Sequence, residues 1–272
     1  MTTVLDFLAN LYHSGLGYSA INTAKCAISS FLTKHSSPIG SHILVKRFMR
    51  GVFILRPSLP KYNVTWDVSK VLTYLEGISV NDNLVHLKEL TMKTVMLLSL
   101  LTGQRLQSLQ LIDLRNVELT DSMVKIRFGD LLKQSRPNYH LHEIMLQKYA
   151  NKQLCIVYHL NLYCKVTKTL RGQGTSLFIS FCKPHRAVSK DTIARWVKEV
   201  MRKSGIDISI FKPHSCRAAS VSHAKKTGVQ IGSILRTAGW SNDCTFRRFY
   251  NKPVSNDTSF AEAVLAKAHK DG

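Results

Sequence analysis

The spacing of apolar residues constrains the fold of this chain more than any other feature. Through most of the sequence, apolar side chains recur every three to four positions, as in helices that bury one face. Only around 117–128 does the period approach two, on either side of a polar turn at 120–122. We therefore predict a mainly α fold with one small antiparallel β-sheet, made of this hairpin and a third strand over 140–146.

The predicted helices lie on both sides of a segment without periodicity. This segment, 56–63, contains two prolines and has the composition of a linker, although a loop within one domain would look similar. A new helix begins at Trp66, so we expect a helical domain over 1–58, a linker over 59–65 and a second domain over 66–272. The predicted helices are 4–11, 19–32 and 43–52 in the first domain, and 68–102 with a polar break at 80–83, 148–166, 190–204, 213–227, 229–238 and 259–268 in the second.

The charge balance indicates a polyanionic partner. The chain has 38 Lys and Arg against 17 Asp and Glu, a formal net charge of +21, and self-repulsion on this scale opposes compaction unless a polyanion binds. A membrane surface is the alternative, but the longest apolar stretch, 95–102, is far shorter than the about 18 residues that a span needs. Nucleic acid is therefore the predicted partner.

The sequence lacks the common signatures of metal sites. Its six cysteines are scattered without a Cys-x-x-Cys pair, which argues against a zinc ribbon and a disulfide framework and fits a reducing compartment. There is no EF-hand loop, no His-Glu-x-x-His motif and no clustered pair of acidic residues. We expect no metal and no cofactor.

Three short motifs carry residue types suited to cutting a phosphodiester bond. The cut requires positive charge near the non-bridging oxygens, an in-line nucleophile and a proton donor for the departing oxygen. The planar guanidinium of arginine can bind two phosphate oxygens at once. The motifs are Thr102-Gly103-Gln104-Arg105, then Pro213-His214-Ser215-Cys216-Arg217, and finally Gly239-Trp240 followed by Arg247-Arg248-Phe249-Tyr250.

Each motif is weak by itself, because a solvated arginine, a chance His-x-x-Arg and a surface tyrosine are all common. In this order, with a small sheet carrying a lysine between the first and second, they resemble the tyrosine recombinase (phage integrase) family from Trp66 to Tyr250. The stretches 65–68, 131–137 and 238–250 are most similar to recombinases encoded by eukaryotic DIRS and Ngaro retrotransposons. The N-terminal helices are similar to the family's core-binding domain, and the resemblance leaves open whether that domain is complete at its N-terminus.

The resemblance implies that three residues bind the phosphate that is cut. Arg105 and Arg217 would hold it and stabilise the charge of the pentacoordinate transition state. Trp240 stands where the family has His or Trp, and would donate its indole N–H to a phosphate oxygen. The alternative for each is a structural role, as a surface arginine or a packed aromatic residue.

The resemblance also implies which groups attack and move protons. Tyr250 would attack and leave a 3′-phosphotyrosyl bond, with His214 as its base or hydrogen-bond partner. A free tyrosine titrates at about pH 10, so it needs a base or a cationic pocket at neutral pH. Lys133 would protonate the departing 5′-oxygen, and Lys125 and Arg136 are alternatives for this role.

Two features depart from the family's pattern. Ser108 stands three residues after Arg105, where the family usually has an acidic residue that partners an arginine. The interval from Trp240 to Tyr250 is one residue longer than is common in bacterial and phage members. Neither departure removes a group that the chemistry requires.

Basic residues outside the motifs are candidates for DNA contacts, because phosphate binding by Lys and Arg supplies most of the affinity for nucleic acid. The alternative is that they are only solvated. The resemblance implies that the two domains form a clamp around duplex DNA. The candidates are Lys25, Lys46, Arg47 and Arg50 in the N-terminal domain and Lys212 and Arg247 beside the motifs.

The resemblance further implies strand exchange by a DNA-bound tetramer, through a Holliday intermediate and without metal or ATP. The amphipathic segment 259–268 would either cap its own domain or reach a neighbouring protomer, and we favour exchange. In a retrotransposon, the task would be to integrate a circular DNA copy in the host nucleus. Two rival functions are a type IB topoisomerase-like enzyme that relaxes supercoils as a monomer, and a recombinase-derived DNA-binding protein without activity.

Overall fold

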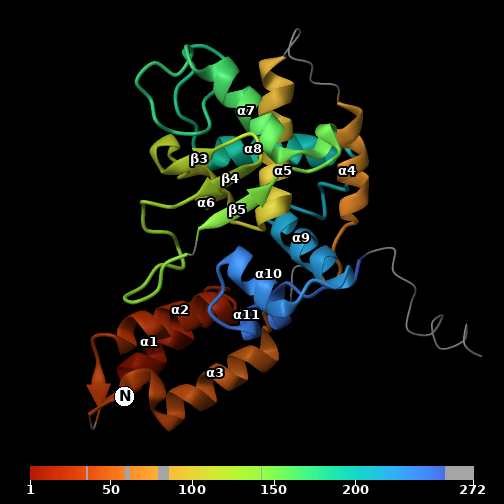
Figure 1. Ribbon diagram of the computed structural model, residues 1–272. Coiled ribbons are helices and arrows are strands. Elements are labelled where there is room, and N and C mark those ends of the chain that lie inside the picture. Colours follow the sequence, from red (N-terminus) through yellow and green to blue (C-terminus); the bar gives the residue numbers. More distant parts are fainter. Residues whose placement is uncertain (35, 59–61, 79–85, 142, 255–272) are drawn as a thin grey trace, which may run out of the picture. The chain divides into compact units, whose positions relative to one another are not determined.

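The computed structural model describes residues 1–254 apart from 35, 59–61, 79–85, 142 and the side chain of Arg248 (Figure 1). The chain divides into two compact units, Met1–Lys61 and a second unit that begins at Tyr62. Each unit has its own hydrophobic core. No helix in the described part of the chain has the length and apolarity needed to cross a membrane.

The first unit is a small bundle of three helices. Its core consists of five buried side chains: Leu8, Ile21, Val45, Met49 and Val52. Arg56, which follows the third helix, links it to the first. Its guanidinium donates to the Tyr12 carbonyl at 2.6 Å and lies 3.9 Å from the centre of the Tyr12 ring. The elements of this unit are α1 (Thr2–His13), α2 (Tyr18–Ser29), β1 (Thr33–Lys34), β2 (Ser37–Pro38), a 3₁₀ turn (Ile39–Ser41) and α3 (Ile43–Leu55).

The second unit is built around one central helix, α5 (Leu87–Thr102), which is buried on nearly all sides. Helices α7 (Ile156–Thr167), α8 (Lys190–Lys203) and α9 (Ser215–Lys226) pack against it (Figure 1). Its buried threonines are tolerated because their hydroxyls donate to carbonyls one turn earlier, as Thr94 does to Leu90 at 2.7 Å. The other helices are α4 (Val68–Gly77), α6 (Leu106–Gln110), α7 (Ile156–Thr167), α8 (Lys190–Lys203), α9 (Ser215–Lys226), α10 (Ile231–Ala238) and α11 (Asp243–Phe249).

A three-stranded antiparallel sheet joins the same core. Strands β3 (Val117–Leu119), β4 (Met123–Ile126) and β5 (Ile144–Gln147) lie in the order β3-β4-β5. Alternate residues of β4 are buried, so one face of the sheet packs inward. The predicted fold class, mainly α with a small antiparallel sheet, is confirmed.

Two predicted boundaries are wrong. The third strand covers Ile144–Gln147 and not 140–146, because its partner β4 provides only the four residues Met123–Ile126 for pairing. The helix predicted from 148 begins at Ile156, because Asn151 first caps a separate 3₁₀ turn. The predicted polar break at 80–83 and the predicted helix over 259–268 lie outside the described residues.

Candidate active site

The start of α9 carries two of the predicted site residues. His214 immediately precedes the helix and Arg217 lies in its first turn. Pro213 suits this position because a helix start needs no N–H from it. Trp66 fixes the helix start, since its indole Nε1 donates a buried 2.8 Å hydrogen bond to Ser215 Oγ. The residues that lead into α4 therefore position the start of α9.

Arg217 is held by the carboxyl-terminal ends of two other helices. Its side chain is 2% exposed, and it donates to the Gly103 carbonyl at 2.5 Å and to the Ala238 carbonyl at 2.8 Å. Carbonyls at helix ends lack partners within the helix and carry partial negative charge. Both ends turn through a glycine with positive φ, Gly103 at +56° and Gly239 at +71°. Burial, together with the positive charge of Arg105, lowers the pKa of Arg217 to about 10, so the guanidinium stays protonated at neutral pH.

Arg105 is held by another side chain. It precedes α6 in an extended conformation, and its Nη1 donates to Gln134 Oε1 at 2.7 Å. The bend before it is fixed by the buried Gln104, whose Nε2 donates to the Thr237 carbonyl at 2.6 Å. The end of α5, the start of α6 and the end of α10 therefore meet at the two arginines.

The phenol of Tyr250 lies among these groups. Its Oη is 3.3 Å from His214 Nε2, and its ring centre is 4.7 Å from that of Trp240 and 5.4 Å from the Arg217 guanidinium carbon. The pKa of His214 lies below its usual value, first because neighbouring atoms shield the ring from water and then because Arg217, Arg105 and Lys133 add positive charge. His214 is therefore neutral at pH 7 and can accept a proton from Tyr250.

The backbone of Tyr250 is fastened on α9. Ser222 Oγ donates to the Tyr250 carbonyl at 2.5 Å and accepts from the Lys252 N–H at 3.1 Å. Pro253, the residue after Lys252, is also held, because its carbonyl accepts a 2.8 Å hydrogen bond from the Thr65 N–H. The helix that carries Arg217 thus also sets the position of the tyrosine.

Lys133 lies at the tip of a turn between β4 and β5. The turn runs from Leu132 to Ser135 and is closed by a 2.8 Å hydrogen bond from the Ser135 N–H to the Leu132 carbonyl. Lys133 is exposed, and its charge contributes to the lowered pKa of His214. The two alternatives are engaged elsewhere: Lys125 pairs with Glu118 and Glu143, each at 3.7 Å, and Arg136 lies over the ring of Tyr139.

Within the part of the chain that the structure describes, three buried N–H donors around this cluster have no hydrogen-bond partner. They are Arg217 Nε, Trp240 Nε1 and Gln134 Nε2. The Arg217 guanidinium lies 4.1 Å from the Trp240 ring centre, and a side chain at Gly239 would come within 3.0 Å of Gln134 Nε2. A buried donor without an acceptor costs free energy, and an anion would satisfy it.

The positive charge at the site is not neutralised by any acidic side chain in the described segments. Among the described residues, no ion pair involves Arg105, Arg217 or Lys133. Within the same residues, no group of three or more His, Cys, Asp or Glu is arranged to hold a metal ion. The arrangement suits a singly charged phosphodiester group.

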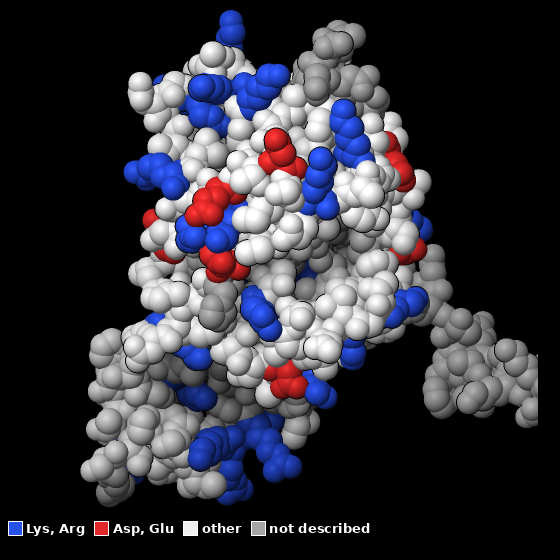
Figure 2. Space-filling model, in the orientation of Figure 1, with Lys and Arg blue, Asp and Glu red and all other residues white. Residues whose placement is uncertain are grey.

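The basic residues predicted to contact DNA differ in whether their charged groups already have partners in the protein. Lys25, Lys46 and Arg50 line a hollow of about 400 Å³ in the first unit, and Arg47 is exposed nearby on α3. Figure 2 shows Lys and Arg widely spread over the visible face and fewer Asp and Glu. In the second unit, Lys212 donates to the carbonyls of Ile208 and Ser209, and Arg247 forms a 2.6 Å ion pair with Asp243.

Four residues that hold the site were not predicted from the sequence. Gln104 precedes Arg105 and Gln134 follows Lys133 in the sequence, so their position next to predicted site residues could have identified them. Ser222 follows Arg217 by five positions on the same helix, and nothing in its sequence context marks it. Trp66 belongs to a motif that supported the family resemblance but suggested no contact.

A comparison with protein-family models gives one match, to the phage integrase family over residues 74–256. No curated protein sequence is similar enough to this chain to count as a match.

Several solved structures share the fold. The crystal structure of XerA recombinase has 16% sequence identity and a TM-score of 0.54, and the match covers 98% of this chain and 90% of that chain. The Tn1549 transposon integrase in complex with transposon right end DNA has 13% identity and a TM-score of 0.59, covering 100% and 85%. A lambda integrase tetramer bound to a Holliday junction has 12% identity and a TM-score of 0.51, covering 94% and 65%.

Proposed function

Because this chain belongs to the phage integrase family, we propose that it is a tyrosine recombinase that cuts and rejoins DNA through Tyr250. One observation carries the proposal. Tyr250 Oη lies 3.3 Å from His214 Nε2, and the Tyr250 ring centre lies 5.4 Å from the guanidinium carbon of Arg217. A nucleophile, a neutral base and a buried cation thus converge, beside donors that lack acceptors.

In the cleavage step, Tyr250 Oη attacks the phosphorus while its proton passes to His214. The phosphotyrosyl bond forms at the 3′ side, the bond to the 5′-oxygen breaks, and Lys133 gives that oxygen a proton. Arg105 and Arg217 bind the non-bridging oxygens, with Trp240 Nε1 as a further donor, and stabilise the transition state. A 5′-hydroxyl on the partner strand reverses these steps. The phosphotyrosyl ester keeps the free energy of the original bond, so neither ATP nor a metal is required.

The motifs at 65–68, 131–137 and 238–250 support a role in integrating the DNA copy of a DIRS- or Ngaro-type retrotransposon, and such a role places the protein in the host nucleus. The charge of +21 supports a clamp in which the N-terminal cations Lys25, Lys46, Arg47 and Arg50 bind one side of the duplex. A DNA-bound tetramer and a Holliday intermediate are proposed by analogy with the lambda integrase tetramer.

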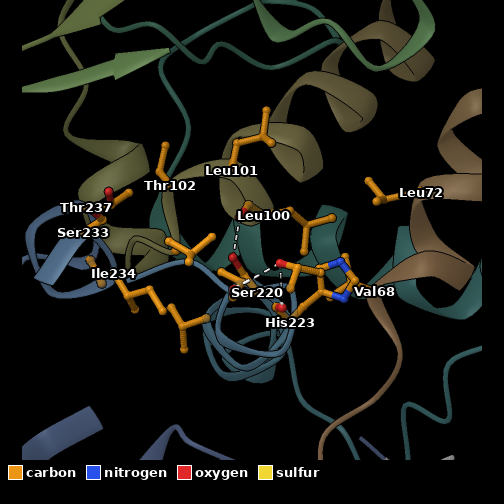
Figure 3. A pocket seen from close by; sticks show the side chains of 16 residues that line it. Val68, Leu72, Leu100, Leu101, Thr102, Ser220, His223, Ser233, Ile234 and Thr237 are labelled. Atoms are coloured by element: carbon orange, nitrogen blue, oxygen red, sulfur yellow. Dashed lines mark hydrogen bonds between the residues drawn. The ribbon is translucent and has the colours of Figure 1, made fainter. Parts of the chain in front are cut away.

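An apolar hollow on the second unit supports exchange of the segment 259–268. The hollow has a volume of about 360 Å³ and is lined by residues of α4, α5, α9 and α10, among them Leu72, Leu100 and Ile234 (Figure 3). An amphipathic segment from a neighbouring protomer would bury its apolar face there. Removal of 255–272 should then prevent tetramers on DNA, measured by light scattering, while a single protomer still cleaves.

A nicked suicide substrate, from which the short fragment with the freed 5′-hydroxyl diffuses away, tests the central proposal. The wild type should accumulate a covalent adduct that mass spectrometry maps to Tyr250, and Tyr250→Phe should bind the same DNA without an adduct. If the wild type binds DNA and forms no adduct, the inactive DNA-binding alternative holds. If it relaxes a supercoiled plasmid as a monomer but does not recombine two paired sites, the topoisomerase alternative holds.

A further inference from the structure

Gln134 connects two parts of the site that are far apart in the sequence. It lies at the tip of the turn from Leu132 to Ser135, directly after Lys133. Its Oε1 accepts the 2.7 Å hydrogen bond from Arg105 Nη1. One side chain therefore joins the turn that carries the lysine to an arginine 29 residues earlier.

The oxygen that holds Arg105 is neutral. A carboxylate there would also accept the hydrogen bond, and more strongly, but its negative charge would offset that of the guanidinium. Arg217 is likewise held by uncharged acceptors, the carbonyls of Gly103 and Ala238. Both arginines are thus fixed in place while their charge stays available for a phosphate.

The turn itself offers few other fixed points at its tip. Leu132 is buried and its N–H and carbonyl are both bonded to Ser135, so the base of the turn is secured. Lys133 is exposed. Among the side-chain hydrogen bonds of the described residues, the one from Arg105 to Gln134 ties the tip to the site.

We infer that Gln134 is a positioning residue with two effects: its neutral oxygen holds Arg105 without cancelling its charge, and the same bond docks the turn that presents Lys133. The inference depends on the proposed DNA cleavage. At position 108, where the family usually has an acidic partner for an arginine, this chain has Ser, and Arg105 is held by a neutral oxygen from a different element.

Two variants of this residue separate the effects. Gln134→Glu keeps the size and the acceptor but adds a negative charge, so adduct formation on the suicide substrate should slow on the order of 10- to 100-fold. Gln134→Met keeps the bulk and loses the acceptor, so it should slow the reaction by releasing the turn. Gln107→Glu is the matched control, since it adds the same charge on an exposed residue two positions from Arg105, and it should change the rate less than threefold, roughly the effect of a screened surface charge.

Substrate changes provide readouts that a purely structural role would not move. In a Tyr250→Phe background, DNA with a neutral methylphosphonate at the cleavage position should bind more weakly than ordinary DNA, and Gln134→Glu should reduce this preference. A substrate with sulfur in place of the departing 5′-oxygen needs less proton donation, because a thiol is far more acidic than an alcohol. It should therefore recover part of the Gln134→Met defect, as it should for Lys133→Ala.

The outcomes are distinct. A wild type that forms no adduct removes the proposed function, and this inference with it. If the wild type cleaves and Gln134→Glu cleaves equally fast, or keeps the full preference for the charged phosphate, the charge effect is wrong. If the sulfur substrate leaves the Gln134→Met defect unchanged, the docking of Lys133 is wrong. Thermal unfolding of each variant tests whether a slower rate comes from loss of the folded structure.

Discussion

The two arginines of the site are held in opposite ways. Arg217 is 2% exposed and donates to backbone carbonyls at the ends of α5 and α10. Arg105 is partly exposed and donates to one side chain, Gln134. The first arginine is fixed by the fold and also helps to hold three helices together, whereas the second is fixed by a residue that a single mutation can replace.

This difference separates stability from catalysis within one cluster. A guanidinium that satisfies buried carbonyls contributes to the free energy of unfolding as well as to the proposed phosphate binding. A guanidinium at a partly exposed helix start is expected to contribute mainly to the proposed phosphate binding. Substitutions at the two positions should therefore both slow cleavage, but only one should strongly destabilise the protein.

The largest effect is expected from Arg217→Met. Loss of the guanidinium leaves the Gly103 and Ala238 carbonyls without donors, so the free energy of unfolding should fall by about 2 kcal/mol. Adduct formation should slow on the order of 1000-fold, since a preorganised cation is lost from the transition state. Urea unfolding and single-turnover cleavage measure the two effects. An unchanged stability would mean that the helix ends do not depend on Arg217.

Arg105→Met should affect activity without a comparable loss of stability. Cleavage should slow on the order of 100-fold, and the free energy of unfolding should stay within about 0.5 kcal/mol of the wild type because the position is partly exposed. The same two measurements apply. If Arg105→Met destabilised the protein as much as Arg217→Met, the contrast between the two arginines would be lost.

The sequence predicted which residues meet, but not how they are held. His-x-x-Arg spacing places Arg217 one turn into a helix, and the glycines after 102 and 238 predict helix ends. That these two ends supply the carbonyls for Arg217 depends on how α5, α9 and α10 pack, and local patterns do not encode this. Even so, the fold class follows from periodicity, because apolar residues three to four positions apart indicate helices and the alternation near 117–128 indicates one small sheet.

The choice among basic residues in the sheet shows the same limit. The sequence favours Lys133 as the proton donor and leaves Lys125 and Arg136 as alternatives. The strand register adds a contact that the sequence does not show, because it places Glu118 opposite Lys125 and brings Glu143 close enough to pair with it. The register depends on how all three strands pair with one another, so it cannot be predicted from the pattern of one segment alone.

A smaller effect is expected from Ser222→Ala, which tests whether α9 positions the nucleophile as well as Arg217. Without the hydroxyl, the Tyr250 carbonyl and the Lys252 N–H lose their shared partner, and adduct formation should slow about tenfold because the phenol is less well aligned. Affinity for DNA should not change. Ser220→Ala is the control: this hydroxyl also donates from α9 to a carbonyl, that of Leu100, so it should cost similar stability and leave the rate unaffected.

The smallest effect concerns pH, and it sharpens the comparison because we expect the protein to stay folded when Arg105 is replaced. His214 must be neutral to accept a proton, so the rate of adduct formation should fall as pH drops through its pKa, which lies below the usual 6.5. Shielding from water lowers this pKa most, followed by the charges of Arg217, Arg105 and Lys133. Arg105→Gln removes one of these charges, so the pKa of His214 should rise and the midpoint of the residual activity should move to higher pH. A midpoint that stays fixed in Arg105→Gln, while His214→Gln abolishes the pH dependence, would place the base beyond the reach of Arg105.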